Sequence, residues 1–454
     1  MKSKQYSIDM VNGPLAGKIL LFAMPLMAST LIQQLFNTAD TIVVGRFAGP
    51  QALAAVGSCS YLVNLFVMFF TGFSAGVDVT ISRFFGAGNA EKVKNGVHTT
   101  IAFSLICGIV LGLLGYFFAP QLLGVMSVPE EIIDQAALYV RIYFLGSPAS
   151  MLYNFGAALL RTQGDTKRPL HYLTISGVLN VILNLVFVIV FHMAADGVAL
   201  ATILSQYLSA FLVIRCLMRE TGPLHFDPRQ LSLNGRIISS IVRLGFPSGI
   251  ENSLYCIANV TIQSAINAFG SAVIAGGSAA SSINSLASIP HGAINQAILT
   301  FASQNYGARR YDRVDRVILL GFLFGTGISL LLTNLCVIFA EPLISIYVGA
   351  DAAVILEGVI RMRTMYPFTF LAAIMGAMTN ALRALGHSMV PMVVAVIGTC
   401  GLRVLWVIFV LPLFGTPPAL YIVWPISWGI TAITLAVFFF AVRKKSYSES
   451  ALQL

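Results

Sequence analysis

Charge is scarce in this 454-residue sequence, because only 10% of its residues are Asp, Glu, Lys or Arg, whereas 57% are hydrophobic. A soluble domain usually contains about 25% charged residues, so the composition excludes an ordinary soluble globular protein. Runs of roughly 20 mostly apolar residues, each long enough to cross a bilayer as a helix, recur between short polar connections. The sequence therefore predicts an all-α integral membrane protein.

Cysteine and catalytic motifs are also sparse. The six Cys residues occur singly, without the spacing of a zinc site or a disulfide framework. The sequence has no P-loop and no H-E-x-x-H motif, which argues against ATP hydrolysis and metalloproteolysis. A G-x-S-x-G match at 72–76 lies in an apolar segment, where small residues favour helix packing, as do Gly108 and Gly112. We expect neither an enzyme nor a cofactor.

The polar connections carry an alternating pattern of charge. Lys and Arg gather in the even-numbered connections and near both ends of the chain, whereas the odd-numbered connections carry mainly acids. The positive-inside rule then predicts a multi-pass protein of the cell (inner) membrane with both termini in the cytoplasm. Because the net charge of +9 is spread over many loops, we expect no nucleic-acid partner. The twelve predicted spans are 18–46, 52–77, 96–118, 135–161, 168–190, 197–218, 237–266, 276–302, 315–340, 354–385, 389–411 and 418–443.

The two halves of the sequence repeat each other at an offset near 222 residues. Three blocks follow in the same order, which indicates a duplication of six spans. The blocks are "FAMPLMAS" (22–29) with "RLGFPSGI" (243–250), "FFGAGNAEKVK" (84–94) with "NYGARRYDRVD" (305–315), and "LLRTQGDTKRP" (159–169) with "ALRALGHSMVP" (381–391).

An even number of spans inserts both copies in the same direction. This parallel repeat predicts two six-helix bundles, with substrate between them and alternating access as the mode of transport. The predicted domains are an amino-terminal lobe at 1–218, a cytoplasmic linker at 219–236 and a carboxyl-terminal lobe at 237–454.

One acid stands within the first predicted span. Gln33, Asn37 and Asp40 are spaced so that one helical face carries all three. An ionised carboxylate inside a membrane costs several kcal/mol and usually has a function, although a static buried hydrogen bond or ion pair is the alternative. Carboxylate, amide and hydroxyl oxygens suit a proton or a small cation. We predict an ion-coupling site made of Asp40, Asn180, Asn184 and Thr202; interhelical hydrogen bonding is the alternative for the last three.

Polar stripes on the first predicted span of each half and on span 8 predict a substrate cleft. Steps of three or four residues place each set on one helical face. Its predicted residues are Gln33 and Asn37, Glu251, Tyr255 and Asn259, and Asn284, Ser288, His291 and Asn295. His291 is either a hydrogen-bonded residue that lines the cleft or a proton carrier, and we favour the first role. Glu251 and Arg403 lie at similar depth, so they either form an ion pair or act in transport. Asp78 and Arg83, near one end of the second span, are expected to be solvated or to snorkel.

The sequence resembles the multidrug and toxic compound extrusion (MATE) family over essentially its whole length. The resemblance is carried by "MPLMAS…NTADTIVVGRFAG", the repeated "GAGNAEKV" and "GARRYDRV", the repeated "LRTQGDTKRP" and "LRALGHSMVP", and "VLNVILN". It implies a V-shaped, two-lobe transporter that exports amphipathic, often cationic compounds in exchange for protons or sodium.

The resemblance also implies roles for individual residues. Asp40, Asn180 and Thr202 match the family's amino-terminal ion site, and Pro25 matches the proline at which its first helix bends. Asn184 stands where some members have a second Asp. Some sodium-coupled members have a Glu on span 7 and an Asp on span 10, where this sequence has Tyr255 and Ala372.

These observations predict a cation-coupled multidrug efflux antiporter. We expect H+ as the coupling ion in preference to Na+. We expect no metal site other than one for sodium at Asp40, which applies if sodium is the coupling ion. The expected partners are small amphipathic or cationic molecules and the lipid bilayer, with no obligate protein partner. A flippase for lipid-linked sugars on a related two-bundle scaffold is the alternative.

Overall fold

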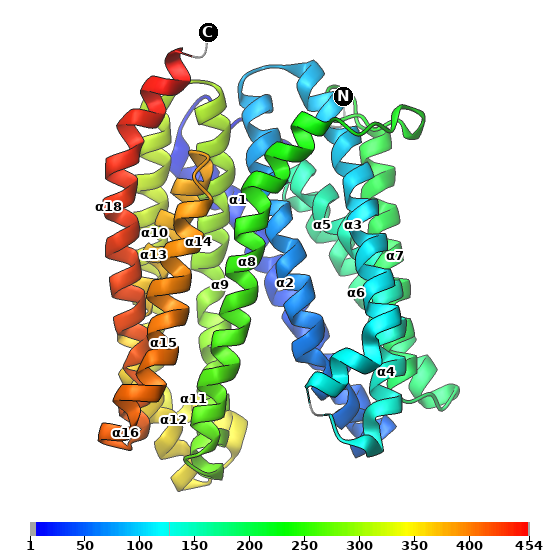
Figure 1. Ribbon diagram of the computed structural model, residues 1–454, viewed down its shortest axis with the longest axis vertical. Coiled ribbons are helices and arrows are strands. Elements are labelled where there is room, and N and C mark those ends of the chain that lie inside the picture. Colours follow the sequence, from blue (N-terminus) through cyan, green and yellow to red (C-terminus); the bar gives the residue numbers. More distant parts are fainter. Residues whose placement is uncertain (1–5, 127, 453–454) are drawn as a thin grey trace. The chain divides into compact units, whose positions relative to one another are not determined.

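The computed structural model describes residues 6–126 and 128–452, and all regular secondary structure in these ranges is helical (Figure 1). The predicted all-α class is therefore confirmed. The helices of the first half are α1 (Leu15–Val43), α2 (Pro50–Gly86), α3 (Ala90–Val125), α4 (Glu130–Leu145), α5 (Ser147–Thr162), α6 (Lys167–Leu185) and α7 (Ala195–Arg219), with π-helical turns at Val44–Ala48 and Val186–Val190.

The second half repeats this series after a short 3-10 turn at Pro228–Gln230. Its helices are α8 (Gly235–Asn267), α9 (Ser271–Gly307), α10 (Tyr311–Ile338), α11 (Ala340–Val348), α12 (Ala352–Met365), α13 (Thr369–Ala384), α14 (Met389–Ala395), α15 (Leu402–Leu405), α16 (Leu411–Phe414), α17 (Pro417–Tyr421) and α18 (Val423–Leu452). A 3-10 turn at Tyr366–Phe368 precedes α13, and π-helical turns at Val396–Gly401 and Trp406–Val410 flank α15.

Ten helical stretches of the described chain are long and apolar enough to cross a membrane. Two of the twelve predicted spans are absent from this set for different reasons. The span predicted at 135–161 is divided into α4 and α5 at Gly146, just before Pro148, whose ring cannot continue a helix from the preceding turn. The span predicted at 237–266 lies on α8, whose 33 residues include polar side chains along most of its length.

Contacts within the chain define two compact units. Unit 1 contains the segment up to Asp9 and Ala28–Gly249, and unit 2 contains Met10–Met27 and the chain from Ile250 onward. Helices α1 and α8 each change unit two residues beyond a proline, Pro25 or Pro247, where a missing backbone hydrogen bond permits a bend. The predicted linker 219–236 lies inside unit 1, so the predicted domain limits stay a prediction drawn from the repeat.

The internal repeat is visible in the backbone. Helices α2 and α9 both contain 37 residues, and each follows a glycine, Gly49 or Gly270, with φ of 91° or 94°. The turns at Gly164 and Gly386 likewise have φ of 88° and 90°. Because this left-handed region disfavours side chains with a Cβ, a glycine is required at each of these corresponding positions.

One pair of corresponding turns differs in its residue and yields a prediction about stability. Gly88 has φ of 68°, whereas its counterpart in the second copy, Arg309, has φ of 58°. A left-handed conformation costs a residue with a Cβ about 1 kcal/mol. We expect Arg309→Gly to raise the free energy of unfolding by about 0.5–1 kcal/mol, measured by thermal unfolding of the purified protein. Arg309→Ala removes the same charge but keeps the Cβ, so a gain of equal size in that variant would contradict the prediction.

Glycines allow close helix crossings within unit 1. A Cβ on Gly72 would lie 2.2 Å from the backbone nitrogen of Gly249, and one on Gly76 would lie 2.3 Å from the carbonyl oxygen of Ile241. Helix α2 therefore meets the first part of α8 backbone to backbone. The predicted packing role of 72–76 is confirmed. Gly108 and Gly112 similarly lie against the backbone of Ser147–Pro148 and the carbonyl oxygen of Phe144.

A buried ion pair joins α2 to α5. Asp78 is fully buried, and its carboxylate accepts hydrogen bonds from Arg161 Nε at 3.2 Å and Ser82 Oγ at 3.3 Å. The prediction that Asp78 is solvated was wrong, because α5 packs on α2 and supplies the counter-ion. Arg83, one turn further along α2, is partly buried.

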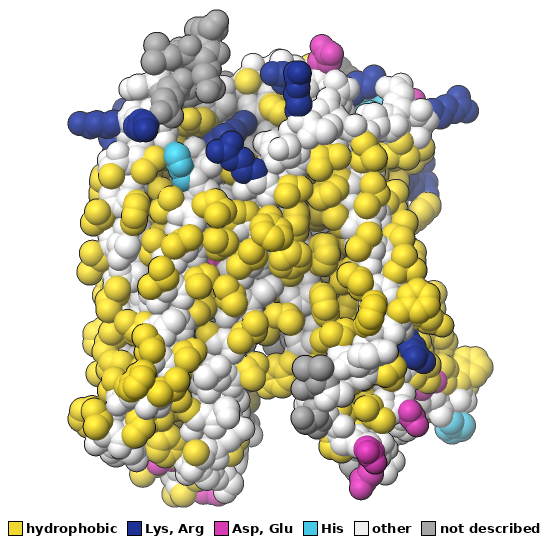
Figure 2. Space-filling model, viewed as in Figure 1, with side chains coloured by type: hydrophobic (Ala, Val, Ile, Leu, Met, Phe, Trp, Pro, Cys, Tyr) yellow, Lys and Arg dark blue, Asp and Glu magenta, His cyan; other side chains and the backbone are white. Residues whose placement is uncertain are grey.

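The surface of each unit suits a lipid environment. On the face drawn in Figure 2, hydrophobic side chains cover the long sides of each unit, and most Lys and Arg lie near the end that carries a chain terminus. Exposed apolar side chains such as Leu331, Ile338 and Phe409 would face hydrocarbon in a membrane.

Candidate functional site

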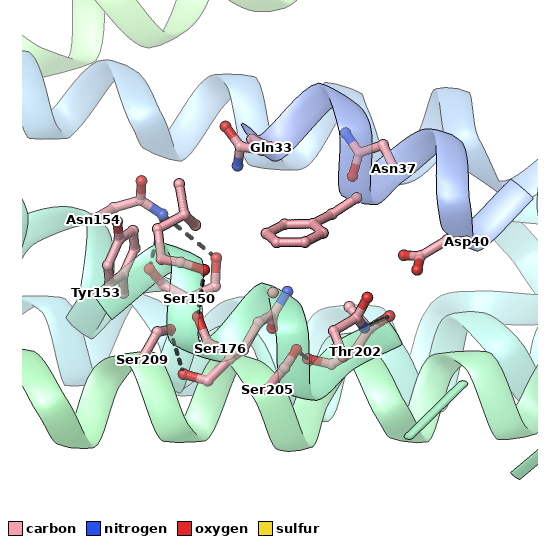
Figure 3. A pocket seen from close by; sticks show the side chains of 15 residues that line it. Gln33, Asn37, Asp40, Ser150, Tyr153, Asn154, Ser176, Thr202, Ser205 and Ser209 are labelled. Carbon is pink, nitrogen blue, oxygen red and sulfur yellow. Dashed lines mark hydrogen bonds between the residues drawn. The ribbon is translucent and has the colours of Figure 1, made fainter. Parts of the chain in front are cut away.

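Unit 1 contains a polar pocket of about 150 Å³ between α1, α5, α6 and α7. Figure 3 shows Gln33, Asn37 and Asp40 along α1, opposite Thr202, Ser205 and Ser209 of α7. Among the described residues that line the pocket, Asp40 alone carries a charge. The lining comprises Gln33, Phe36, Asn37, Asp40, Ser150, Tyr153, Asn154, Leu173, Ser176, Gly177, Asn180, Thr202, Ser205, Gln206 and Ser209.

A chain of hydrogen bonds leads from Asp40 to α7. The Asn184 amide donates to the Asp40 carboxylate, and the same nitrogen lies 3.4 Å from Asn180 Oδ1. Asn180 Nδ2 in turn lies 3.5 Å from Thr202 Oγ1, and the Thr202 hydroxyl donates to the carbonyl oxygen of Val198 at 2.9 Å. The structure thus brings together all four residues of the predicted ion site; their role in coupling stays a prediction.

One amide oxygen beside Asp40 lacks a donor. Asn184 Oδ1 is buried and has no hydrogen-bond partner in the structure, although the Asn184 amide nitrogen donates to Asp40. Buried acceptors are nearly always satisfied, so such an oxygen is suited to an incoming proton donor, water or cation. Together with the Asp40 carboxylate and the Thr202 hydroxyl it is a hard oxygen of the kind that binds a monovalent cation. Gln206 Oε1 is also buried without a partner, but it lies against Gly146. The described residues include no cluster of three or more His, Cys, Asp or Glu side chains placed to hold a metal.

The predicted cleft residues of α8 lie in unit 2, where they contact other polar groups. Glu251 forms an ion pair with Arg383 of α13 at 2.7 Å. Arg403 instead donates to Ser427 Oγ at 3.2 Å and to Asn259 Oδ1 at 3.5 Å. The alternative in which Glu251 pairs with Arg403 is therefore wrong. It was based on the similar depth of the two residues in their helices, whereas α13 places Arg383 next to Glu251. Tyr255 donates to Thr399 Oγ1 at 3.4 Å.

The polar stripe of α9 also lies in unit 2. Asn284 Oδ1, His291 Nδ1 and Asn295 Oδ1 are buried without a hydrogen-bond partner, and Ser288 lies partly buried between them. Such atoms are compatible with bound water or with a polar ligand. The part that these residues play in a substrate cleft stays a prediction.

The MatE family model matches the chain twice, over residues 25–186 and 247–409. This chain belongs to the MATE family. The two matches begin at Pro25 and Pro247, the prolines that the repeat aligns, so the duplication found in the sequence is confirmed. The family is one of membrane transporters.

Individual relatives agree with the family match. The probable multidrug resistance protein YoeA of Bacillus subtilis is 29% identical over 394 residues, which cover 85% of this chain and 84% of the relative. The probable multidrug resistance protein NorM of Thermotoga maritima is 26% identical, with 84% and 82% covered. A solved outward-facing structure of a multidrug resistance MATE family transporter of the MOP superfamily has a TM-score of 0.88 at 23% identity, with 97% and 98% covered. That likeness shows the fold.

Several lining residues of this MATE pocket were missed in the sequence. Ser150 and Asn154 come from α5, and Ser205, Gln206 and Ser209 come from α7. Their spacing of three or four residues from one another, and from Thr202, would have placed each set on one helical face. The signal was present but weak, because single serines are common in membrane helices and often bond to their own backbone, as Ser205 and Ser209 do here.

The Phe36 ring closes one side of the pocket and offers a test of its shape. A Cβ on Gly177 would lie only 1.7 Å from this ring, so Gly177→Ala must displace it or separate α1 from α6. We expect Gly177→Ala to lower the transport rate several-fold, measured in proteoliposomes at equal protein density. Gly57→Ala is the matched control, because a Cβ there meets no atom within 4 Å. Equal rates in the two variants would show that the position of Phe36 is unimportant.

Proposed function

We propose that this MATE protein is a cation-coupled multidrug efflux antiporter, which exports amphipathic, often cationic compounds across the cell (inner) membrane with both termini in the cytoplasm. The named activity of relatives such as YoeA supports multidrug transport as the broad function. The distribution of Lys and Arg among the connections supports the orientation. The mode of transport is alternating access, as in other transporters built from repeats.

The pocket around Asp40 is the observation that carries the proposal. Its volume of about 150 Å³ holds an ion with water, whereas drug-sized sites usually have about 300–1,000 Å³. The pocket is therefore the site of the coupling ion, and the drug binds elsewhere in the predicted cleft. A single carboxylate among neutral oxygens is neutralised by one monovalent cation, so the charge of the site changes by one in each cycle.

The proton is the preferred coupling ion. A protonated carboxyl group gains an O–H donor, and the nearby Asn184 Oδ1 is an acceptor that lacks a donor. Sodium would need several oxygens to replace its water, and Asp40 is the only carboxylate among the described lining residues. Sodium coupling is the alternative that the experiment below decides.

Helix α1 couples binding of the ion to release of the drug. Asp40 lies 15 residues beyond Pro25 on this helix, roughly 22 Å along its axis. Loss of charge at Asp40 changes the packing of α1 on α6 and α7, and Pro25 allows the helix to bend in response. Since a ligand shifts an equilibrium only through its different affinities for the two states, ion entry and drug release then exclude each other.

The flippase alternative gains no support from the pocket or from the relatives described above. A lipid pyrophosphate requires cations, and the described lining of the unit 1 pocket contains no Lys or Arg.

Ethidium movement in proteoliposomes tests the proposal, with a pH gradient or a sodium gradient imposed separately. We expect the pH gradient alone to drive uptake into the vesicle lumen in the direction opposite to proton flow. Ethidium movement under the sodium gradient alone would show that sodium, and not the proton, is the coupling ion. Movement under neither gradient, from protein that is folded and inserted, would overturn the antiporter.

A further inference from the structure

Unit 2 buries two arginines beside one tryptophan. The guanidinium carbons of Arg361, on α12, and Arg403, on α15, each lie 5.4 Å from the centre of the Trp424 ring. Arg361 lies equally close to the ring of Tyr421. Only 7% of Arg361 and 3% of Arg403 is exposed. These four residues are called the arginine–tryptophan cluster below.

The hydrogen-bond partners of the two arginines are neutral. Arg403 donates to the hydroxyl of Ser427 and to the amide oxygen of Asn259, and Arg361 donates to the carbonyl oxygen of Gly277 at 2.9 Å. Within the described chain, no carboxylate lies within the 4.0 Å of an ion pair with either arginine. The nearby Glu251 is paired with Arg383 instead.

Two buried guanidinium groups without a counter-ion are costly. Arginine remains charged at any physiological pH, and removing such a charge from water is unfavourable. Contact with an aromatic face offsets only part of that cost. The Tyr421 hydroxyl is also buried, and it has no hydrogen-bond partner. An anion bound at the cluster would supply a counter-charge to both arginines and an acceptor to this hydroxyl.

The internal repeat places this cluster where unit 1 has its acid. At an offset of 222 residues, Asn37 corresponds to Asn259, Asp40 to Ile262 and Thr202 to Trp424. At the same offset Asn180 corresponds to Leu402, the neighbour of Arg403. The second copy therefore lacks the carboxylate of the first copy and carries a cation near the corresponding place.

We infer that the arginine–tryptophan cluster is a binding site for a small organic anion that carries a carboxylate next to an aromatic ring. Guanidinium groups bind carboxylates through paired, charge-assisted hydrogen bonds, and the Tyr421 hydroxyl adds a donor. The indole and phenol rings, whose faces meet the guanidinium groups, can contact the ring of an aromatic ligand through their edges. The inference does not depend on ion coupling at Asp40, which belongs to the other unit.

Tryptophan fluorescence of the purified full chain tests the inference, because Trp424 is one of only three Trp residues. We expect benzoate to produce a saturable change that is absent from Trp424→Phe. The affinity for benzoate should fall at least tenfold in Arg403→Gln and in Arg361→Gln. Arg443→Gln is the matched control: it removes an arginine of α18 that is paired with Asp315 at 3.1 Å, and its affinity should be unchanged.

Further ligands and variants make the outcome decisive. Benzylamine has a similar ring and the opposite charge, so equal binding of benzylamine would overturn recognition of an anion. Chloride or inorganic pyrophosphate binding more tightly than benzoate would overturn the assignment to an organic carboxylate. Glu357→Gln, which removes the acid one turn before Arg361, should tighten benzoate binding, because it removes repulsion. Should Arg403→Gln fail to fold, Arg403→Lys and the wild-type comparison of benzoate with benzylamine still decide the matter. No saturable response of the wild type to benzoate would sink the proposal.

Discussion

Asp40→Asn is expected to reduce gradient-driven ethidium transport at least about tenfold, which corresponds to about 1.4 kcal/mol or more of lost coupling. The variant keeps the size of the side chain but cannot bind a proton or carry a negative charge. The pocket then has no group whose charge depends on the ion, so neither gradient distinguishes the two states of the transporter. Transport is measured in proteoliposomes under the gradient that drives the wild type.

Two variants separate this effect from a general loss of structure. Asp196→Asn makes the same chemical change in unit 1 outside the lining of the pocket, and its amide oxygen can still accept from the backbone nitrogen of Ala194. It should transport at the wild-type rate. Asp40→Glu keeps the ionisable group and should retain part of the activity. Pumping by Asp40→Asn at the wild-type rate would remove Asp40 from the coupling mechanism.

Much of the fold was predictable from the sequence, because the bilayer imposes a simple rule on it. A helix that crosses hydrocarbon needs a long apolar run, and such runs are readable without knowledge of contacts. The repeat was also readable, since Pro25 and Pro247 lie in similar blocks. The break at Gly146 was not predicted, because hydropathy hardly changes across it and Pro148 is compatible with the first turn of a new helix.

Those features of the ion site that depend on spacing within a single helix were predictable. Asp40 is an acid in an apolar span, and Asn180 and Asn184 share a face of α6, so their helical spacing sufficed. Contacts between helices were not accessible in this way. Glu251 pairs with Arg383, and Arg403 meets Trp424, because of how α8, α13, α15 and α18 pack in unit 2. Sequence spacing carries no information about which helices become neighbours.

The same limit explains why the burial of Asp78 was not predicted. At this residue we expect the largest effect of a substitution on stability. Asp78→Asn leaves Arg161 as a largely buried cation without its counter-ion, since the side chains of Asp78 and Arg161 are 0% and 15% exposed. Breaking a buried pair from one side typically costs about 3–5 kcal/mol, and we expect a loss of this order in the free energy of unfolding in detergent. Arg161→Met should cost a similar amount.

The double variant Asp78→Asn/Arg161→Met shows whether the loss of stability comes from an unpaired charge or from disturbed packing at either position. Because it removes both charges, it should be more stable than Asp78→Asn alone, and the two single effects should not add. Asp315→Asn provides the matched comparison: Asp315 and Arg443 are each 32% exposed, and an exposed pair contributes only about 0–1 kcal/mol. If Asp78→Asn cost no more than Asp315→Asn, the pair between α2 and α5 would be incidental to stability. A large cost with recovery in the double variant would show that α5 is held on α2 by charge as well as by the apolar core of unit 1.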